Sequence, residues 1–257
     1  MDAVVLAGGG TEPGLDPALP NKAFVLIAGR PLVAHVVAAL GKTPSIERIA
    51  VVGPEPALRA MLPESVTVVP AVGSMMDNVV QAVNALQPRG LTLVTAADLP
   101  LLTPLVVEDV IDACAAEPGD FYYPIVPDNV ILAQFPAAQK MFITMAEGTF
   151  CAGNMMVVDP KILPRVRPFV ERLIAARKQP LMLRLLVAQA LGWSIFTKLY
   201  TGRLSIAEVT ARASETLGVR IVPVIVEHPE IAMDVDVGRA ENFEMIRGVF
   251  SPPESSS

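Results

Sequence analysis

Residues 2–10 read DAVVLAGGG, an apolar segment that runs directly into three consecutive glycines. Residues 3–7 predict a buried strand, and Gly8, Gly9 and Gly10 predict a tight turn that leaves backbone N–H groups open. Glycine allows a ligand to approach the backbone closely, because it has no Cβ and accepts positive φ. The pattern fits a loop that binds a polyphosphate, and it fits a plain turn between a strand and a helix equally well.

Lys22 follows this glycine segment after a short loop. A lysine ammonium is a point charge suited to phosphate oxygens. Its position favours the polyphosphate interpretation, without excluding the plain turn.

Further apolar runs alternate with amphipathic stretches and predict repeated βα units. We expect strands at 46–52, 66–69 and 91–96, and helices at about 32–40, 57–61 and 76–86. Such units build a parallel sheet that is covered by helices on both faces, and ligands bind beyond the carboxyl ends of its strands. Gly8–Gly10 and Asp98 both fall at such ends.

The rhythm changes after Asp120. FYYPIVP (121–127) predicts a strand, and MFITMAEGTF (141–150) followed by GNMMVVDP (153–160) predicts two strands joined through a Glu-Gly turn. The sheet should therefore be mixed. Several consecutive helices are expected over 160–217, then a strand at 219–226, a helix at about 239–249 and a frayed tail at 251–257. We expect one domain over 1–257, with 160–217 as a helical subdomain inserted before the last strands.

Composition limits the class of protein. Of 257 residues, 52% are hydrophobic and 18% charged, yet no apolar run reaches the ~18 residues of a membrane span. The net charge of −6 argues against a nucleic-acid partner, which would need a basic face. No export signal is recognisable, so a cytoplasmic location is expected. The spacing of Cys114 and Cys151 suggests neither a zinc site nor a disulfide framework.

The apolar helical stretch 181–199 contains Arg184, Lys198 and Trp193. It predicts a helix packed on the sheet or in a homodimer contact. A basic helix that bears a tryptophan can also lie on a membrane surface or line a lipophilic groove. The sequence leaves these alternatives open.

Asp98 is the first candidate for metal chemistry. The strand at 91–96 delivers it to the rim of the sheet, within the segment AADLPLLTP. Thr103, directly before Pro104, is the better N-cap for the next helix, which leaves Asp98 available to hold a hard cation.

Asp234 and Asp236 are the second acidic feature. Alternate residues of a strand share a face, so a strand at 233–236 would point both carboxylates the same way. Like charges in apolar surroundings repel each other unless a cation or donor groups lie between them. Oxygen ligands without a Cys/His cluster favour Mg²⁺ over Zn²⁺.

The segment Gly73–Val79 leads into a helix. Ser74 and Asp77 are spaced as in a capping box. The same helix N-terminus could also hold a base edge or a ribose. Both roles are compatible.

These segments, in this order, resemble the MobA-like NTP transferase group of the nucleotidyltransferase superfamily, which has the glycosyltransferase-A-like fold. The matching stretches are LAGGG, Asn21-Lys22, GRPLVAHVVAAL, Gly73–Val79, AADLPLLTP, FCAGNMMVVDP and DVDVGRAENF. The resemblance implies a three-layer, Rossmann-like α/β fold with a mixed, mostly parallel sheet and a C-terminal helical insertion. It also implies transfer of an NMP from an NTP, CTP or GTP, to a phosphorylated small-molecule acceptor, with release of pyrophosphate.

The resemblance further implies the roles of individual residues. Lys22, Asp98 and Asp236 would be catalytic, Mg²⁺ would be held by Asp98 and Asp236 with Asp234 as a further candidate, and Gly153 and Asn154 would face the acceptor. The nucleotide contacts would be Leu6, Ala7, Gly8, Gly9, Gly10, Lys22, Gly73, Ser74, Asn78 and Ala97. Family members usually carry an arginine in the loop after the glycines. Here that loop reads Thr11-Glu12-Pro13, so phosphate binding should be weaker or arranged differently.

Three rival functions remain. A Rossmann dehydrogenase needs G-x-G-x-x-G and an acid about 20 residues on, at the end of the second strand, and the chain has neither. A glycosyltransferase that uses Asp234-x-Asp236 for its metal would turn over nucleotide sugars without releasing pyrophosphate. A non-catalytic nucleotide-binding module would bind NTP without turnover.

Overall fold

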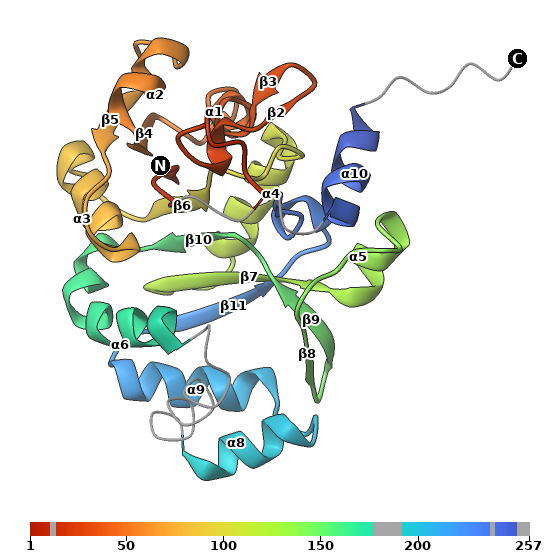
Figure 1. Ribbon diagram of the computed structural model, residues 1–257. Coiled ribbons are helices and arrows are strands. Elements are labelled where there is room, and N and C mark those ends of the chain that lie inside the picture. The colour runs from red at the N-terminus through yellow and green to blue at the C-terminus, as the bar shows by residue number, and fades with distance from the viewer. Residues whose placement is uncertain (11–13, 177–191, 237–239, 251–257) are drawn as a thin grey trace, which may run out of the picture.

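The computed structural model describes residues 1–10, 14–176, 192–236 and 240–250. A nine-stranded sheet forms its centre, in the order β5-β4-β1-β6-β10-β7-β9-β8 with β11 paired to β7 (Figure 1). The strands are β1 (Asp2–Leu6), β4 (Arg48–Gly53), β5 (Thr67–Pro70), β6 (Thr92–Ala96), β7 (Phe121–Pro127), β8 (Phe142–Met145), β9 (Gly148–Ala152), β10 (Met155–Val158) and β11 (Ile221–Ile225). β2 (Leu26–Ile27) and β3 (Arg30–Pro31) pair separately.

The sheet is mixed and mostly parallel, as expected. β1 is parallel to both β4 and β6, and the register sets Leu6 beside Val52 and Ala96. β9 and β10 run opposite to the other strands of the sheet. The carboxyl ends of β1, β4 and β6 therefore meet at one rim.

Alternate residues of the central strands are buried on opposite faces. Ala3 and Val5 of β1 join one core cluster, whereas Val4 joins another. Helices α1 (Leu32–Leu40), α2 (Glu55–Met61) and α4 (Pro104–Ala115) contribute to the first core, and α3 (Met75–Leu86) and α6 (Leu163–Ala176) to the second. Burial on both faces explains why these strands read as continuous apolar runs, and it confirms the three-layer α/β architecture.

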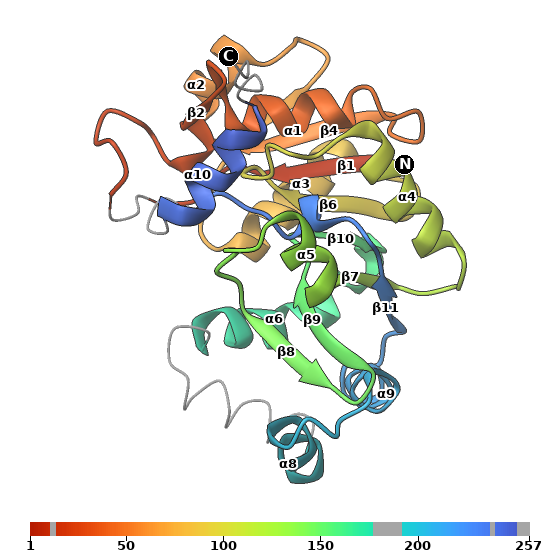
Figure 2. The same ribbon diagram turned by 90° about the vertical axis from the view of Figure 1, so that its right-hand side faces the viewer.

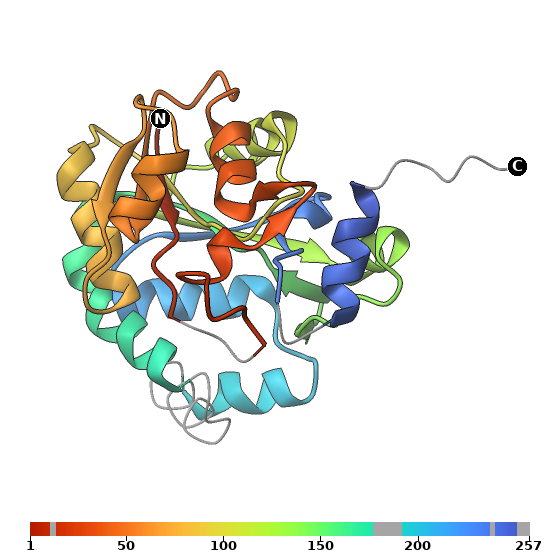
Figure 3. The same cartoon turned by 45° about the horizontal axis from the view of Figure 1, so that its top comes forward.

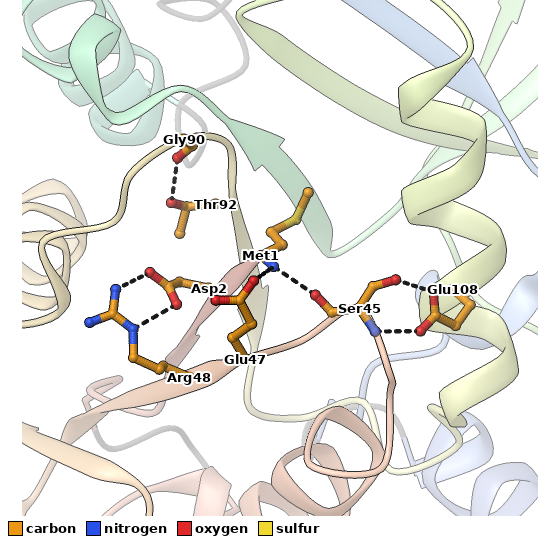
Figure 4. A network of polar contacts seen from close by, with 8 residues as sticks. All are labelled: Met1, Asp2, Ser45, Glu47, Arg48, Gly90, Thr92 and Glu108. Carbon is orange, nitrogen blue, oxygen red and sulfur yellow. Dashed lines mark hydrogen bonds and ion pairs between the residues drawn. The ribbon is translucent and has the colours of Figure 1, made fainter.

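Polar contacts fasten the rim at the amino ends of these strands (Figure 4). Arg48, which begins β4, donates to both carboxylate oxygens of Asp2 in β1, at 2.9 and 2.5 Å. Ser45 donates its backbone N–H and its hydroxyl to Glu108 of α4, at 2.7 and 2.6 Å. These contacts lie at the opposite end of the sheet from the glycine turn. They stabilise the amino ends of the strands and do not involve residues at the carboxyl ends.

The segment 141–160 forms three strands, and the prediction of two was wrong. β8 and β9 form a hairpin whose turn falls at Ala146-Glu147, inside the first predicted segment. β10 then inserts between β6 and β7 and pairs antiparallel with both. Figure 2 shows the hairpin at the edge of the sheet, close to α8 (Trp193–Tyr200) and α9 (Ile206–Leu217). The three-strand arrangement depends on pairing between distant strands, which local sequence patterns do not report.

The described parts of the segment between β10 and β11 are mainly helical, as predicted: η2 (Pro160–Ile162), α6, α8 and α9. Residues 181–191 of the apolar stretch 181–199, Arg184 among them, lie outside the described residues. The described part, α8, buries none of its side chains, and Trp193 is 64% exposed. Contact of this stretch with a lipophilic partner or a second copy stays a prediction.

The remaining elements are η1 (Lys22–Phe24), α5 (Asp128–Gln134), η3 (Pro229–Ile231) and α10 (Ala240–Val249). α10 confirms the last predicted helix, and the tail 251–257 lies outside the described residues. None of the described helices is both long and apolar enough to span a membrane.

Candidate active site

The glycine turn follows β1 at the carboxyl rim. A Cβ on Gly8 would come within 2.9 Å of Ala71 Cβ and 3.2 Å of Asn78 Nδ2, so Gly8 lets this loop pack directly on the segment before α3. At Gly9 and Gly10, which are exposed, a Cβ would meet none of the described atoms within 4 Å. The turn thus combines one packing glycine with two whose backbone is open to a ligand.

The backbone groups on either side of the turn are engaged in the sheet. Ala7 N–H donates to Val52 O at 2.8 Å, and Ala97 N–H donates to Leu6 O at 3.2 Å. Leu6, Ala7 and Ala97 therefore shape the rim, and we expect any phosphate contact from this turn to come from Gly9 and Gly10.

Asn21 ties the next loop to this turn. Its buried side chain donates from Nδ2 to Ala7 O at 2.8 Å and accepts from Ala23 N at 2.9 Å, which caps η1. The cap fixes Lys22, whose Nζ lies 2.7 Å from Asp98 Oδ2. Asn21 was not among the expected site residues, although its position directly before Lys22 was a signal for it.

Asp98 follows β6 and is only 5% exposed. One carboxylate oxygen pairs with Lys22, whereas the other, Oδ1, is buried and has no hydrogen-bond partner among the described residues. Burial raises the pKa of this carboxyl, the Lys22 ammonium opposes that effect, and the charge of Asp234 adds to it. Thr103 caps α4 by accepting from Val106 N at 3.2 Å, which confirms that Asp98 does not serve as the cap.

Asp234 lies close enough to Asp98 for their charges to interact, and its neighbour Val235 bonds to the Asp98 backbone. Residues 233–236 have no regular secondary structure, so the predicted strand there was wrong. Val235 N–H donates to Asp98 O at 3.0 Å. Asp234 Oδ1 accepts from Asn154 Nδ2 at 3.1 Å and from Lys140 Nζ at 2.5 Å. The structure brings Lys22, Asp98, Asp234 and Asn154 together and adds Lys140, and the roles implied for these residues stay predictions.

Lys140 is a second residue that the sequence analysis missed. It lies in the loop between α5 and β8, its side chain is 7% exposed, and it follows no motif in the sequence. A lone lysine in an irregular segment gives no signal that it will be buried against an aspartate far along the chain.

Asp236 is half-buried and closes the described segment before 237–239. Its part in holding a cation stays a prediction. The charge interaction that raises the pKa of Asp98 comes from Asp234.

The segment before α3 has a clear structural role. Ser74 accepts from Asp77 N, and Asp77 accepts from Ser74 N at 2.7 Å, which completes the predicted capping box. Gly73 has φ +49°, a conformation that favours glycine. Asn78 is buried and accepts from Val72 N at 2.7 Å, so its side-chain oxygen is already engaged.

A shallow groove of about 380 Å³ borders this element, lined by Val72, Gly73, Asp77, Val80, Gln81 and Asn84. Contacts of this segment with a base or ribose stay a prediction.

Gly153 and Asn154 differ in their surroundings. A Cβ on Gly153 would come within 2.8 Å of Ile231 Cδ1 and 3.1 Å of Pro124 O, so this glycine permits close packing. Asn154 N–H donates to Ile231 O at 2.7 Å, and its side chain reaches Asp234. Asn154 thus contacts the Asp234 carboxylate, whereas Gly153 packs against Ile231 and Pro124, and contact of either residue with an acceptor stays a prediction.

The donor set suits Mg²⁺. No group of three or more His, Cys, Asp or Glu side chains within the described ranges could hold a metal alone. Mg²⁺ is usually bound by one or two carboxylates together with substrate phosphates and water, so a small carboxylate set fits it. The buried Oδ1 of Asp98, for which the described ranges offer no hydrogen-bond partner, is an oxygen atom that could bind a cation or accept from a donor.

The chain is similar to known proteins in sequence and in fold. Residues 3–193 match the family of the MobA-like NTP transferase domain. A solved structure described as a hypothetical transferase from Thermus thermophilus is 35% identical, with a TM-score of 0.81, over 94% of this chain and 98% of that one. No curated protein matches the sequence.

Two more distant structures share the fold. A CMP:2-keto-3-deoxy-manno-octonic acid synthetase complexed with CTP is 14% identical, with a TM-score of 0.57, over 96% of each chain. A 4-diphosphocytidyl-2C-methyl-D-erythritol synthase from Anaerococcus prevotii DSM 20548 is 10% identical, with a TM-score of 0.55, over 97% of this chain and 96% of that one.

Proposed function

Because the chain belongs to the MobA-like NTP transferase family, we propose that it transfers an NMP from an NTP to a phosphorylated small-molecule acceptor and releases pyrophosphate. CTP and GTP are the favoured donors. CTP comes first, because one structure of the same fold was solved with CTP and another is a diphosphocytidyl synthase.

A single observation carries the proposal: Lys22 and buried Asp98 form an ion pair at the carboxyl rim, and one oxygen of Asp98 has no hydrogen-bond partner among the described residues. The capped position of Lys22 lies beside the glycine turn, because Asn21 bonds to Ala7. An ammonium next to open glycine backbone can bind the negative oxygens of a triphosphate. The carboxylates behind it can hold the cation that a triphosphate carries.

In the proposed reaction, an oxygen of the acceptor phosphate attacks the α-phosphorus of the NTP, and the bond between that phosphorus and the oxygen bridging to the β-phosphate breaks. Pyrophosphate leaves with the electron pair of that bond. Lys22 neutralises phosphate charge, and the backbone of Gly9 and Gly10 orients the chain of phosphates. Asp98 would hold Mg²⁺ together with Asp236, Asp234 being a further candidate ligand. Bound there, the ion would neutralise charge on the reacting phosphates.

The site needs no strong general base. A phosphate monoester has a second pKa of about 6, so the acceptor is already ionised near neutral pH. The loop after the glycines carries Thr11-Glu12-Pro13 where family members usually have an arginine, so we expect Lys22 to bear more of the charge neutralisation here.

The experiment is a pyrophosphate-release assay with each of the four NTPs, Mg²⁺ and a panel of sugar phosphates and polyol phosphates. The proposal predicts release that requires both an NTP and one class of acceptor. Turnover of nucleotide sugars without pyrophosphate would support a glycosyltransferase instead, and NTP binding without any turnover would support a non-catalytic module. A cytoplasmic location and a homodimer belong to the same proposal.

A further inference from the structure

Lys140 is a buried cation at the edge of the carboxylate pair. Its side chain is 7% exposed, and its Nζ lies 2.5 Å from Asp234 Oδ1. Lys140 Nζ also lies 3.5 Å from the backbone oxygen of Asp234. Burying an ammonium is costly unless a counter-charge faces it, so this lysine is held here by Asp234.

The C-terminal helix holds the Lys140 loop in place. Asn242 of α10 is fully buried, accepts from Gln139 N at 2.9 Å and donates to Gln139 O at 3.2 Å. Glu241 also pairs with the Gln139 side chain. Figure 3 shows α10 lying beside the α5 region from which this loop departs. The N–H and the C=O of Gln139, the residue before Lys140, are thus both hydrogen-bonded to α10. These bonds hold the loop in the position from which the Lys140 side chain reaches Asp234.

Asp98 and Asp234 each form an ion pair with a lysine. Lys22 pairs with Asp98 at 2.7 Å and Lys140 with Asp234 at 2.5 Å. Each of these two neighbouring carboxylates thus faces an ammonium group, which offsets the repulsion between them. A divalent cation that entered between them would add two positive charges close to Lys140, and like charges at that range repel strongly in a water-poor site.

We propose that Lys140 is a positioning residue that occupies Asp234 in place of the divalent cation and releases Asp234 when the cation binds. This inference rests on the proposed function. In that reaction, Lys140 would keep the affinity of the site for a divalent cation low while no nucleotide is bound. The cation would then bind tightly only together with the triphosphate, whose negative charge attracts it. Asp98 Oδ1, which has no hydrogen-bond partner in the described part of the chain, marks where that cation is expected.

The test measures Mn²⁺ binding to the nucleotide-free protein by electron paramagnetic resonance. Lys140→Met removes the charge at similar length, and we expect it to raise the affinity for Mn²⁺ about tenfold. Lys140→Arg keeps the charge and should stay near wild type, whereas Asp234→Asn should bind Mn²⁺ more weakly than wild type. The matched control is Lys198→Met, because Lys198 also pairs with a carboxylate, Glu208, but on the helical segment away from the site.

An unchanged or lower Mn²⁺ affinity in Lys140→Met would overturn the inference, since a lysine with a merely structural role does not compete with a metal. Lys140→Gln, which keeps a hydrogen-bond donor for Asp234, gives the same test if the methionine variant does not fold. Pyrophosphate release by the wild-type protein is measured separately. Its absence would overturn the proposed function, whereas the Mn²⁺ comparison alone decides the exchange.

Discussion

Lys22 Nζ and Asp98 Oδ2 lie 2.7 Å apart, although they come from η1 and from the end of β6. The pairing depends on the parallel register of β1 and β6 and on the cap that Asn21 gives to η1. Lys22 is 25% exposed on its side chain and can reach a ligand, whereas Asp98 is held beneath it. The pair therefore links an accessible cation to a buried carboxylate.

Replacing Asp98 by asparagine should abolish turnover while the protein stays folded. The variant removes the charge that would hold Mg²⁺, and we expect pyrophosphate release to fall by about 10³-fold with any acceptor that wild type uses. Asp109→Asn is the control, because Asp109 is more exposed and pairs with His228 away from the rim. Full activity in Asp98→Asn would show that the metal assignment is wrong.

The same variant gives a test in pH. Burial raises the pKa of the Asp98 carboxyl above its ordinary value of 3.8, despite Lys22. The folded state therefore binds this proton more tightly than the unfolded chain, so the contribution of Asp98 to stability is fully present below the ordinary pKa and is lost as pH rises through the raised pKa. The free energy of unfolding of wild type relative to Asp98→Asn should fall as pH rises.

Urea unfolding of both proteins between about pH 4 and pH 8 measures this difference. The account fails on this point if the difference stays constant or favours wild type increasingly at higher pH.

Gly8 and Gly9 should respond differently to alanine. A Cβ at Gly8 would press on Ala71 at 2.9 Å, so we expect Gly8→Ala to lose about 1–3 kcal/mol of unfolding free energy. A Cβ at Gly9 would meet no described atom within 4 Å, so Gly9→Ala should stay within about 0.5 kcal/mol of wild type and should weaken NTP binding instead. Thermal unfolding and nucleotide titration of both variants separate the two effects; equal destabilisation would contradict the assigned roles.

Two matching capping boxes separate stability from binding at the α3 segment. Ser74 pairs with Asp77 at the start of α3, and Ser205 pairs with Glu208 at the start of α9. Alanine at either serine should cost about 1 kcal/mol of unfolding free energy. Only Ser74→Ala should also lower NTP affinity, measured by isothermal titration. If Ser205→Ala lowers it equally, the effect is general destabilisation and the α3 segment has no part in binding.

The sequence predicted the parts of the fold that depend on local pattern. The apolar runs of β1 and β6 predict strands that are buried on both faces, and Ser74 and Thr103 predict the starts of α3 and α4. The sequence also predicted that Thr103, and not Asp98, caps α4, and the structure confirms this prediction. Strand ends and caps are set by neighbouring residues, so they can be read from the chain directly.

Long-range pairing was beyond the sequence. β10 inserts between β6 and β7, which no local pattern indicates. The alternation in Met233–Asp236 suggested a strand, but an irregular segment tied by Val235 to Asp98 satisfies the same pattern. The burial of Lys140 against Asp234 depends on α10 holding its loop, a contact between segments far apart in sequence.

The central claim is that Lys22 and the Asp98 carboxylate converge beside the glycine turn to bind an NTP together with Mg²⁺. Thermal unfolding with each of the four NTPs, with and without Mg²⁺, tests it most directly, because a ligand that binds only the folded state raises the melting temperature. The account predicts that CTP or GTP stabilises wild type only when Mg²⁺ is present, and that Lys22→Met and Asp98→Asn each lose this stabilisation. Equal stabilisation of wild type and both variants, or stabilisation that is indifferent to Mg²⁺, would contradict it.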